Sequence, residues 1–83
     1  MTITIYSTTT CPYCRQLKEY LTSRNIAFSE KLIDQDETAQ KEMEGLSNGY
    51  LGVPFTCIVS NDGKKETVLG FDKGKLNSVL GIQ

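Results

Sequence analysis

Two cysteines placed where a strand gives way to a helix constrain the fold of this chain most. Residues 11–14 read Cys-Pro-Tyr-Cys. The preceding residues 2–7 alternate apolar and polar side chains, which predicts a strand, and the residues after the pair carry apolar side chains at helical spacing. Pro12 suits the first turn of that helix, because its missing N–H needs no partner there. The helix is predicted to run to about Ser23 or Arg24, with Asn25 as its C-terminal cap.

The rest of the chain predicts three more strands and two more helices. The strands are expected at residues 26–33, 55–59 and 66–71, and the helices at 37–47 and from Asp72, which would cap the last one. The order βαβαββα predicts an α/β fold, because a parallel βαβ unit and an antiparallel hairpin together form a four-stranded mixed sheet flanked by three helices. Reactive groups of such sheets gather at the carboxyl ends of the strands, where Cys11 would lie.

The composition limits the class of protein. Eighty-three residues are expected to form one domain, residues 1–83. Nine basic and ten acidic side chains give the chain a net charge of -1. The chain therefore lacks the excess of basic residues that is expected of a nucleic-acid-binding protein. No apolar run approaches the ~20 residues of a membrane span, and no basic region followed by an apolar stretch marks a secretory signal. We therefore expect a cytoplasmic monomer that binds neither nucleic acid nor membrane.

The three cysteines and the absence of histidine limit the chemistry. An odd number of cysteines is not the framework of a disulfide-rich secreted domain. Zinc would need a second cysteine pair or histidines, so no metal site is expected. The third cysteine, Cys57, lies within the apolar strand at 55–59. It is interpreted as core filler, with a regulatory thiol as the alternative.

The cysteine pair is predicted to carry dithiol redox chemistry, with Cys11 as the attacking thiolate and Cys14 as the resolving thiol. An ordinary thiol, of pKa ~8.5, is a poor nucleophile at neutral pH. Unpaired N–H groups and the dipole at the start of a helix favour the thiolate of Cys11. Cys14 would lie one turn further along and be less exposed. The alternative to a redox-active pair is that the two cysteines form a permanent disulfide or are two ordinary thiols.

On these residues, the chain resembles the glutaredoxin family over nearly its whole length. Cys-Pro-Tyr-Cys is typical of dithiol glutaredoxins, and it is accompanied by Val53-Pro54 and by Gly70-Phe71-Asp72 before the last helix. The resemblance implies a thioredoxin-like fold and a thiol–disulfide oxidoreductase that reduces protein disulfides or glutathione-mixed disulfides. It also implies glutathione as co-substrate and no tightly bound cofactor.

The resemblance further implies roles for residues around the pair. Pro54 would be cis and face the disulfide, and Val53 would offer its backbone N–H and C=O to glutathione or a substrate peptide, like an added strand. Tyr13 would flank the reactive sulfur, and Asp72 would lie near the glutamyl end of glutathione or simply cap the helix. Pro12 would support the active site.

The chain departs from the family pattern at three positions. Thr8 stands where glutaredoxins often carry Lys, Gly52 where many carry Thr, and Phe71 where many carry a second Gly. Phe71 is expected to crowd the groove for the glutamyl moiety. Lys41 is the candidate anchor of the glycine carboxylate of glutathione.

Three alternative functions stay open. The small size and the missing Lys and Gly-Gly fit a redoxin that takes electrons from thioredoxin reductase and serves ribonucleotide reductase, although Cys-Pro-Tyr-Cys counts against it. An iron–sulfur scaffold would bridge a [2Fe–2S] cluster through Cys11 and glutathione, which Pro12 disfavours. An interaction module with incidental cysteines would keep its activity after Cys11→Ser.

Overall fold

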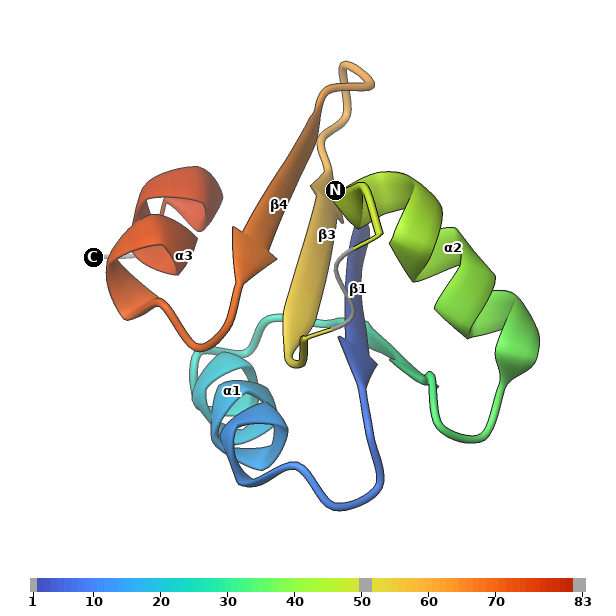
Figure 1. The fold of residues 1–83 in the computed structure, drawn as a ribbon. Coiled ribbons are helices and arrows are strands. Elements are labelled where there is room, and N and C mark those ends of the chain that lie inside the picture. Colours follow the sequence, from blue (N-terminus) through green and yellow to red (C-terminus); the bar gives the residue numbers. More distant parts are fainter. Residues whose placement is uncertain (1, 50–51, 82–83) are drawn as a thin grey trace.

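The computed structural model describes residues 2–49 and 52–81 of the chain. Within those residues, four strands and three helices follow one another in the predicted order (Figure 1). They are β1 (Thr2–Ser7), α1 (Pro12–Ser23), β2 (Ser29–Leu32), α2 (Glu37–Ser47), β3 (Phe55–Val59), β4 (Lys65–Leu69) and α3 (Lys73–Leu80).

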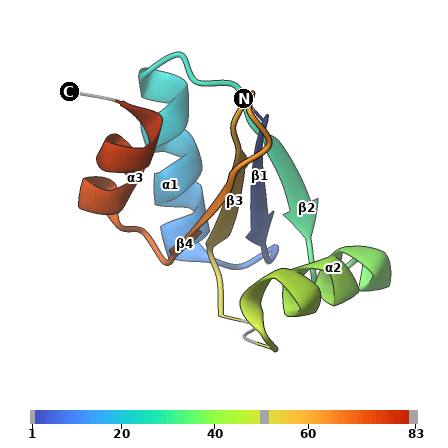
Figure 2. The same ribbon diagram turned by 90° about the horizontal axis from the view of Figure 1, so that it is seen from above.

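The strands form one mixed sheet in the order β2-β1-β3-β4. β1 pairs with β2 in parallel, whereas the β1–β3 and β3–β4 pairs are antiparallel. Figure 2 shows α1 and α3 on one face of the sheet and α2 on the other. The predicted architecture is therefore confirmed. None of the helices formed by the described residues is long and apolar enough to cross a bilayer.

The predicted strand beginning at Ile26 is too long, because β2 begins only at Ser29. The C-cap residue of α1 is Arg24, one position before the predicted Asn25, and Asn25 follows it in a left-handed conformation with φ 59°. The N–H of Ile26 then donates to the carbonyl of Leu21 at 3.0 Å, which closes the end of α1. Ile26 and Phe28 pack against the core instead of pairing in the sheet. Apolar residues that serve a helix cap thus resemble the start of a strand.

The hairpin strand predicted over residues 66–71 lies instead over Lys65–Leu69. Gly70 has φ 72°, and its N–H donates to the carbonyl of Pro54 at 2.8 Å. The chain therefore leaves the sheet two residues earlier than predicted, and Gly70 and Phe71 form the turn into α3.

The sheet separates two apolar clusters. The cluster under α1 and α3 consists of Ile3, Ile5, Leu17, Leu21, Ile58, Val68 and Leu76. The cluster under α2 consists of Tyr6, Ala39, Met43, Phe55 and Cys57. The two sets alternate along β1 and β3, because successive side chains of a strand point to opposite faces.

Cys57 is buried in the cluster under α2 and forms no disulfide. Burial raises the pKa of its thiol above the ordinary value, although Lys65 opposes this effect. A buried thiol of raised pKa is a poor nucleophile. The structure therefore agrees with the interpretation of Cys57 as core filler.

The strand directions bring three loops to one edge of the sheet. Tyr6 lies opposite Phe55, and Phe55 lies opposite Leu69. The carboxyl ends of β1, β2 and β4 therefore meet where β3 begins, as the strands in Figure 1 also show. The loop before Cys11, the segment 52–54 and the turn 70–72 all leave the sheet at this edge.

Candidate functional site

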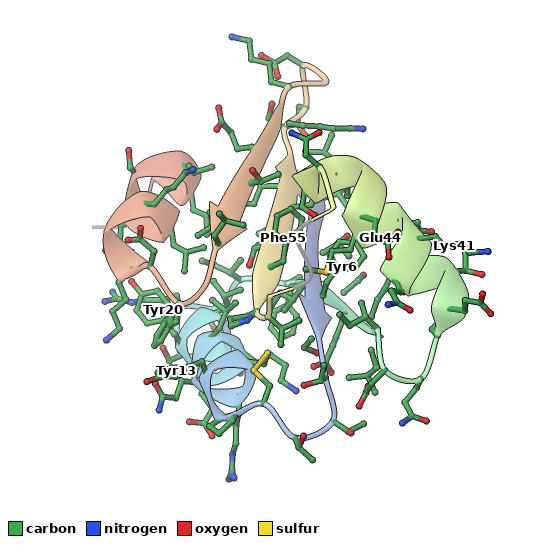
Figure 3. All side chains as sticks on the ribbon, in the orientation of Figure 1. Tyr6, Tyr13, Tyr20, Lys41, Glu44 and Phe55 are labelled. Atoms are coloured by element: carbon green, nitrogen blue, oxygen red, sulfur yellow. A yellow bond between two sulfur atoms is a disulfide. The ribbon has the colours of Figure 1, made fainter. Side chains whose placement is uncertain are left out.

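Cys11 and Cys14 form a disulfide at the start of α1, and their Cα atoms lie 5.2 Å apart (Figure 3). Cys11 is the N-cap residue, with φ -100° and ψ 108°, and Pro12 occupies the first turn as predicted. The Cys14 N–H donates to the Cys11 sulfur at 3.1 Å. This amide would stabilise a thiolate on Cys11 after reduction, and the helix dipole acts in the same direction.

The two sulfurs differ in access. Cys11 is half-buried at the surface, whereas Cys14 is only 1% exposed. A bulky disulfide substrate can therefore approach Cys11 but not Cys14. This asymmetry suits an outer attacking sulfur and an inner resolving sulfur.

The two basic side chains that follow the pair are both engaged by carboxylates. Arg15 Nε lies 3.3 Å from Glu19 Oε1, and both side chains are largely exposed. Lys18 Nζ lies 2.7 Å from Glu30 Oε2. Arg15, Lys18 and Glu19 line a cavity beside Cys11, together with residues 8–12. Because these charges are paired with carboxylates and partly exposed, they are expected to add little to the effect of the helix start on the Cys11 sulfur.

Glu30 links three elements close to the site and was not singled out by sequence reasoning. Its carboxylate accepts from Lys18 of α1, and from the Ser7 hydroxyl of β1 at 2.7 Å. Burial alone would raise the pKa of Glu30, but the hydrogen bonds from Lys18 and Ser7 outweigh it and lower the pKa below its ordinary value. No local sequence signal identifies this network, because its members are brought together by the pairing of β1 with β2.

The Val53–Pro54 peptide bond is cis, as expected for Pro54. Pro54 is fully buried and Val53 is half-buried. The hydrogen bond from Gly70 to the Pro54 carbonyl joins this segment to the turn before α3. Val53 and Pro54 thus lie at the same edge of the sheet as the loop that carries Cys11.

Tyr13 and Asp72 lie at the starts of two helices. Tyr13 follows Pro12 in the first turn of α1 and is 63% exposed, and Figure 3 shows its position beside this helix. Asp72 is the N-cap residue of α3, and its Oδ1 accepts from the Lys75 N–H at 3.1 Å. The capping role considered for Asp72 is therefore present.

Lys41 is not brought to the site. Figure 3 shows it on the outer side of α2, away from the disulfide. Its Nζ lies 3.6 Å from Glu37 Oε1 on the same helix. The expectation that Lys41 anchors a glycine carboxylate beside the cysteines is therefore wrong, because α2 turns this side chain toward solvent.

Phe71 packs between α1 and α3. Its ring meets the ring of Tyr20 edge-on, with the centroids 6.0 Å apart. The Tyr20 hydroxyl donates to Asn77 of α3, and Lys73 Nζ lies 5.5 Å from the Phe71 centroid. Phe71 therefore has a structural role in holding α3 against α1.

Among the described residues, no group of three or more Asp, Glu or Cys side chains is arranged to hold a metal ion. The site consists of a sulfur pair at a helix start, a cis-proline segment and a capped helix at one sheet edge. Such a site can exchange a disulfide with a substrate that reaches Cys11.

Comparisons with known sequences agree with this site. The family model described as Glutaredoxin matches residues 3–60. A glutaredoxin-like 8.6 kDa protein in the rubredoxin operon of Clostridium pasteurianum is 38% identical over 78 residues, which cover 94% of this chain and 96% of that protein. Glutaredoxin 3 of Escherichia coli is 39% identical over 41 residues, or 49% of each chain.

Solved structures identify the fold as thioredoxin-like. The thioredoxin-like protein BC3987 superposes with a TM-score of 0.79 and 31% identity, covering 94% of this chain and 99% of that one. NrdH-redoxin of Escherichia coli, described as a glutaredoxin-like protein with a thioredoxin-like activity profile, has a TM-score of 0.76 and 23% identity, with 95% of each chain covered. The second likeness bears on the fold alone.

Proposed function

This chain belongs to the glutaredoxin family, and from that membership we propose that it is a dithiol oxidoreductase in which Cys11 attacks and Cys14 resolves. The observation that carries the proposal is the position of the pair, with an accessible N-cap sulfur and a buried sulfur one turn further along α1. A thiolate at such a position is both favoured and reachable.

The proposed reaction moves two electrons from the dithiol to a substrate disulfide. The Cys11 thiolate attacks one substrate sulfur, which forms a mixed disulfide and releases the other substrate sulfur as a thiolate. The Cys14 sulfur loses its proton and attacks the Cys11 sulfur. The bond from Cys11 to the substrate breaks, the second substrate sulfur leaves and takes up a proton, and the Cys11–Cys14 disulfide remains.

The proposed substrates are protein disulfides and glutathione-mixed disulfides, with glutathione as the co-substrate that restores the dithiol. The backbone of Val53 would pair with the extended peptide beside Pro54, and Tyr13 would cover the mixed disulfide. The carboxylate of Asp72, exposed at the start of α3, would meet the glutamyl end of glutathione. We place this activity in a monomer in the cytoplasm, where cellular reductants keep thiols reduced.

Reduction by thioredoxin reductase is the second candidate, and the charges around the site favour it. Arg15 and Lys18 are engaged by carboxylates, Lys41 points away, and Thr8 carries no charge. None of these four positions therefore offers an unpaired cation to the two carboxylates of glutathione.

One coupled assay separates the two reductants. NADPH oxidation is followed with a glutathionylated peptide as substrate, in one arm with glutathione and glutathione reductase, and in the other with thioredoxin reductase alone. Turnover in the glutathione arm supports the glutathione-dependent activity. Turnover confined to the other arm assigns the second reductant, and no turnover in either arm contradicts the dithiol proposal.

Substituting each cysteine tests the two roles. Cys11→Ser is expected to reduce turnover to background with every substrate, because the attacking sulfur is lost. Cys14→Ser is expected to keep deglutathionylation of a peptide but to lose reduction of a protein disulfide, since the mixed disulfide can then be resolved only by glutathione. The measurement is the initial rate with each substrate.

Cys57→Ala is the matched control, because this thiol lies in the core under α2 and outside the site. It is expected to retain the wild-type rates. Equal loss of deglutathionylation in Cys11→Ser and Cys14→Ser would remove the distinction between an attacking and a resolving sulfur.

A further inference from the structure

Two polar side chains are fully buried among the described residues, and they differ in hydrogen bonding. Ser7 and Thr56 are both 0% exposed. The Ser7 hydroxyl donates to the Glu30 carboxylate at 2.7 Å. The Thr56 Oγ1 atom has no hydrogen-bond partner within residues 2–49 and 52–81. An unpaired buried hydroxyl destabilises a protein, so its presence in the central strand β3 requires a physical reason.

The register of the sheet places Thr56 on the face that α1 covers. Thr56 lies opposite Ile5 of β1 and opposite Val68 of β4. Directly paired residues of antiparallel strands point their side chains to the same face. Ile5 and Val68 belong to the cluster under α1 and α3, which includes Leu17. Thr56 is therefore a polar side chain placed between the apolar side chains of Ile5 and Val68.

Cys14 is buried on the side of α1 that also carries Leu17 and Leu21. Cys14 is the first of the three, so it lies nearest to the edge of the sheet where β1 ends. Thr56 is the second residue of β3, which begins at that edge. The inner sulfur and the unpaired hydroxyl thus lie near the same edge of the sheet.

We propose that the Thr56 hydroxyl is the hydrogen-bond partner of the Cys14 sulfur when the disulfide is open. A disulfide sulfur has no proton to donate, whereas a thiol has an S–H donor and a hydroxyl has lone pairs that accept it. Thr56 is therefore a positioning residue for the inner thiol. This inference rests on the resolving role of Cys14 in the proposed function.

The redox cycle makes and removes this contact. In the dithiol state, the Cys14 S–H donates to Thr56. During resolution, Cys14 gives its proton to solvent and its sulfur bonds to the Cys11 sulfur. The bond from Cys11 to the substrate breaks at the same time, and the substrate thiolate leaves and is protonated. The closed disulfide has no S–H, and the Thr56 hydroxyl donates to neither sulfur in the observed disulfide state, so the proposed contact forms only when the Cys14 sulfur is released. The hydroxyl therefore favours the dithiol over the disulfide.

The test compares three proteins in a dithiothreitol redox buffer. Thr56→Val removes the hydroxyl with a similar side-chain shape, and Thr56→Ser keeps the hydroxyl. Thr56→Val is expected to shift the dithiol–disulfide equilibrium threefold to tenfold toward the disulfide. This shift corresponds to a reduction potential about 14–30 mV more negative, since tenfold is 29.6 mV for a two-electron couple. Thr56→Ser is expected to stay within about twofold of the wild type.

A second readout follows the Cys14 thiol directly. In a Cys11→Ser, Cys57→Ala background, Cys14 is the single remaining thiol. Its S–H stretching frequency in the infrared is expected to be lower with Thr56 than with Thr56→Val, because a hydrogen bond weakens the S–H bond. A merely structural role of Thr56 would not move this frequency.

Two results overturn the inference. One is a reduction potential of Thr56→Val that is equal to, or less negative than, that of the wild type. The other is an S–H stretching frequency of Cys14 that is the same with Thr56 and with Thr56→Val. If Thr56→Val fails to fold, Thr56→Ala gives the same comparison against Thr56→Ser. Both readouts are independent of turnover, so an inactive wild-type protein would contradict the proposed function without deciding the contact.

Discussion

At the scale of single residues, Tyr6 links the core under α2 to charges at the surface. Its ring is 4% exposed and packs against Phe55, with the centroids 6.0 Å apart. Its hydroxyl donates to Glu42 Oε2 at 3.3 Å, and Lys31 Nζ lies 2.6 Å from the same oxygen. Burial and the negative charge of Glu42 raise the pKa of Tyr6 to about 12.

This shift predicts a loss of stability at alkaline pH that depends on the Tyr6 hydroxyl. Between pH 10.0 and about 12, the tyrosine of the unfolded chain releases its proton while the folded protein keeps it. Stability is therefore retained below the unfolded pKa and falls as pH rises toward the folded pKa. We expect the wild type to lose on the order of 1–2 kcal/mol more than Tyr6→Phe over this range. Urea unfolding of both proteins across the range measures the difference, and parallel curves would contradict it.

At the scale of elements, Glu30 of β2 joins α1 to the sheet through Lys18 and Ser7. Glu30→Gln is expected to destabilise the protein by about 1 kcal/mol at neutral pH, since the ion pair is partly exposed. The folded pKa of Glu30 lies below its ordinary value, so its contribution is present above the unfolded pKa and is lost as pH falls through the folded pKa. Unfolding free energies of the two proteins should therefore converge in acid. A constant gap would show that the carboxylate charge is not involved.

Two substitutions of Asp72, the N-cap residue of α3, distinguish a capping role from a ligand-binding role. Asp72→Ala is expected to cost about 1 kcal/mol, because the hydrogen bond to the Lys75 N–H is lost. Asp72→Asn keeps a capping oxygen and should fold with nearly wild-type stability. If the carboxylate also meets glutathione, Asp72→Asn raises the KM for glutathione at unchanged stability. Unchanged KM in both variants would limit Asp72 to the cap.

At the scale of the whole molecule, the two apolar clusters share β1 and β3 and should unfold together. Leu17 and Met43, both 0% exposed, lie in different clusters on opposite faces of the sheet. Leu17→Ala and Met43→Ala are each expected to cost about 2–5 kcal/mol and to shift one common transition. Leu69→Ala, at a side chain 54% exposed, is the control and should change stability by less than about 0.5 kcal/mol. Separate transitions in circular dichroism and fluorescence would contradict a single domain over residues 1–83.

Most element boundaries could be predicted because the signals that determine them are local. The alternation of residues 2–7, the proline at the start of α1 and the capping side chain of Asp72 act over a few residues of chain. The predicted start of a strand at Ile26 is wrong, because an apolar residue after a helix can either begin a strand or close the helix. Only the packing of Ile26 on the core distinguishes the two.

Local patterns along the chain were enough to predict the cysteine pair at the helix start, the order of the elements and the end of the sheet where the pair lies. Those features follow from side-chain periodicity and from the short range of capping interactions. Three features come only from the folded chain: Lys18, Glu30 and Ser7 form one network, Lys41 faces away from the disulfide, and the Thr56 hydroxyl is buried without a partner among the described residues. These depend on which strands pair and in which register, and hydrogen bonding between distant residues has no signature along the chain.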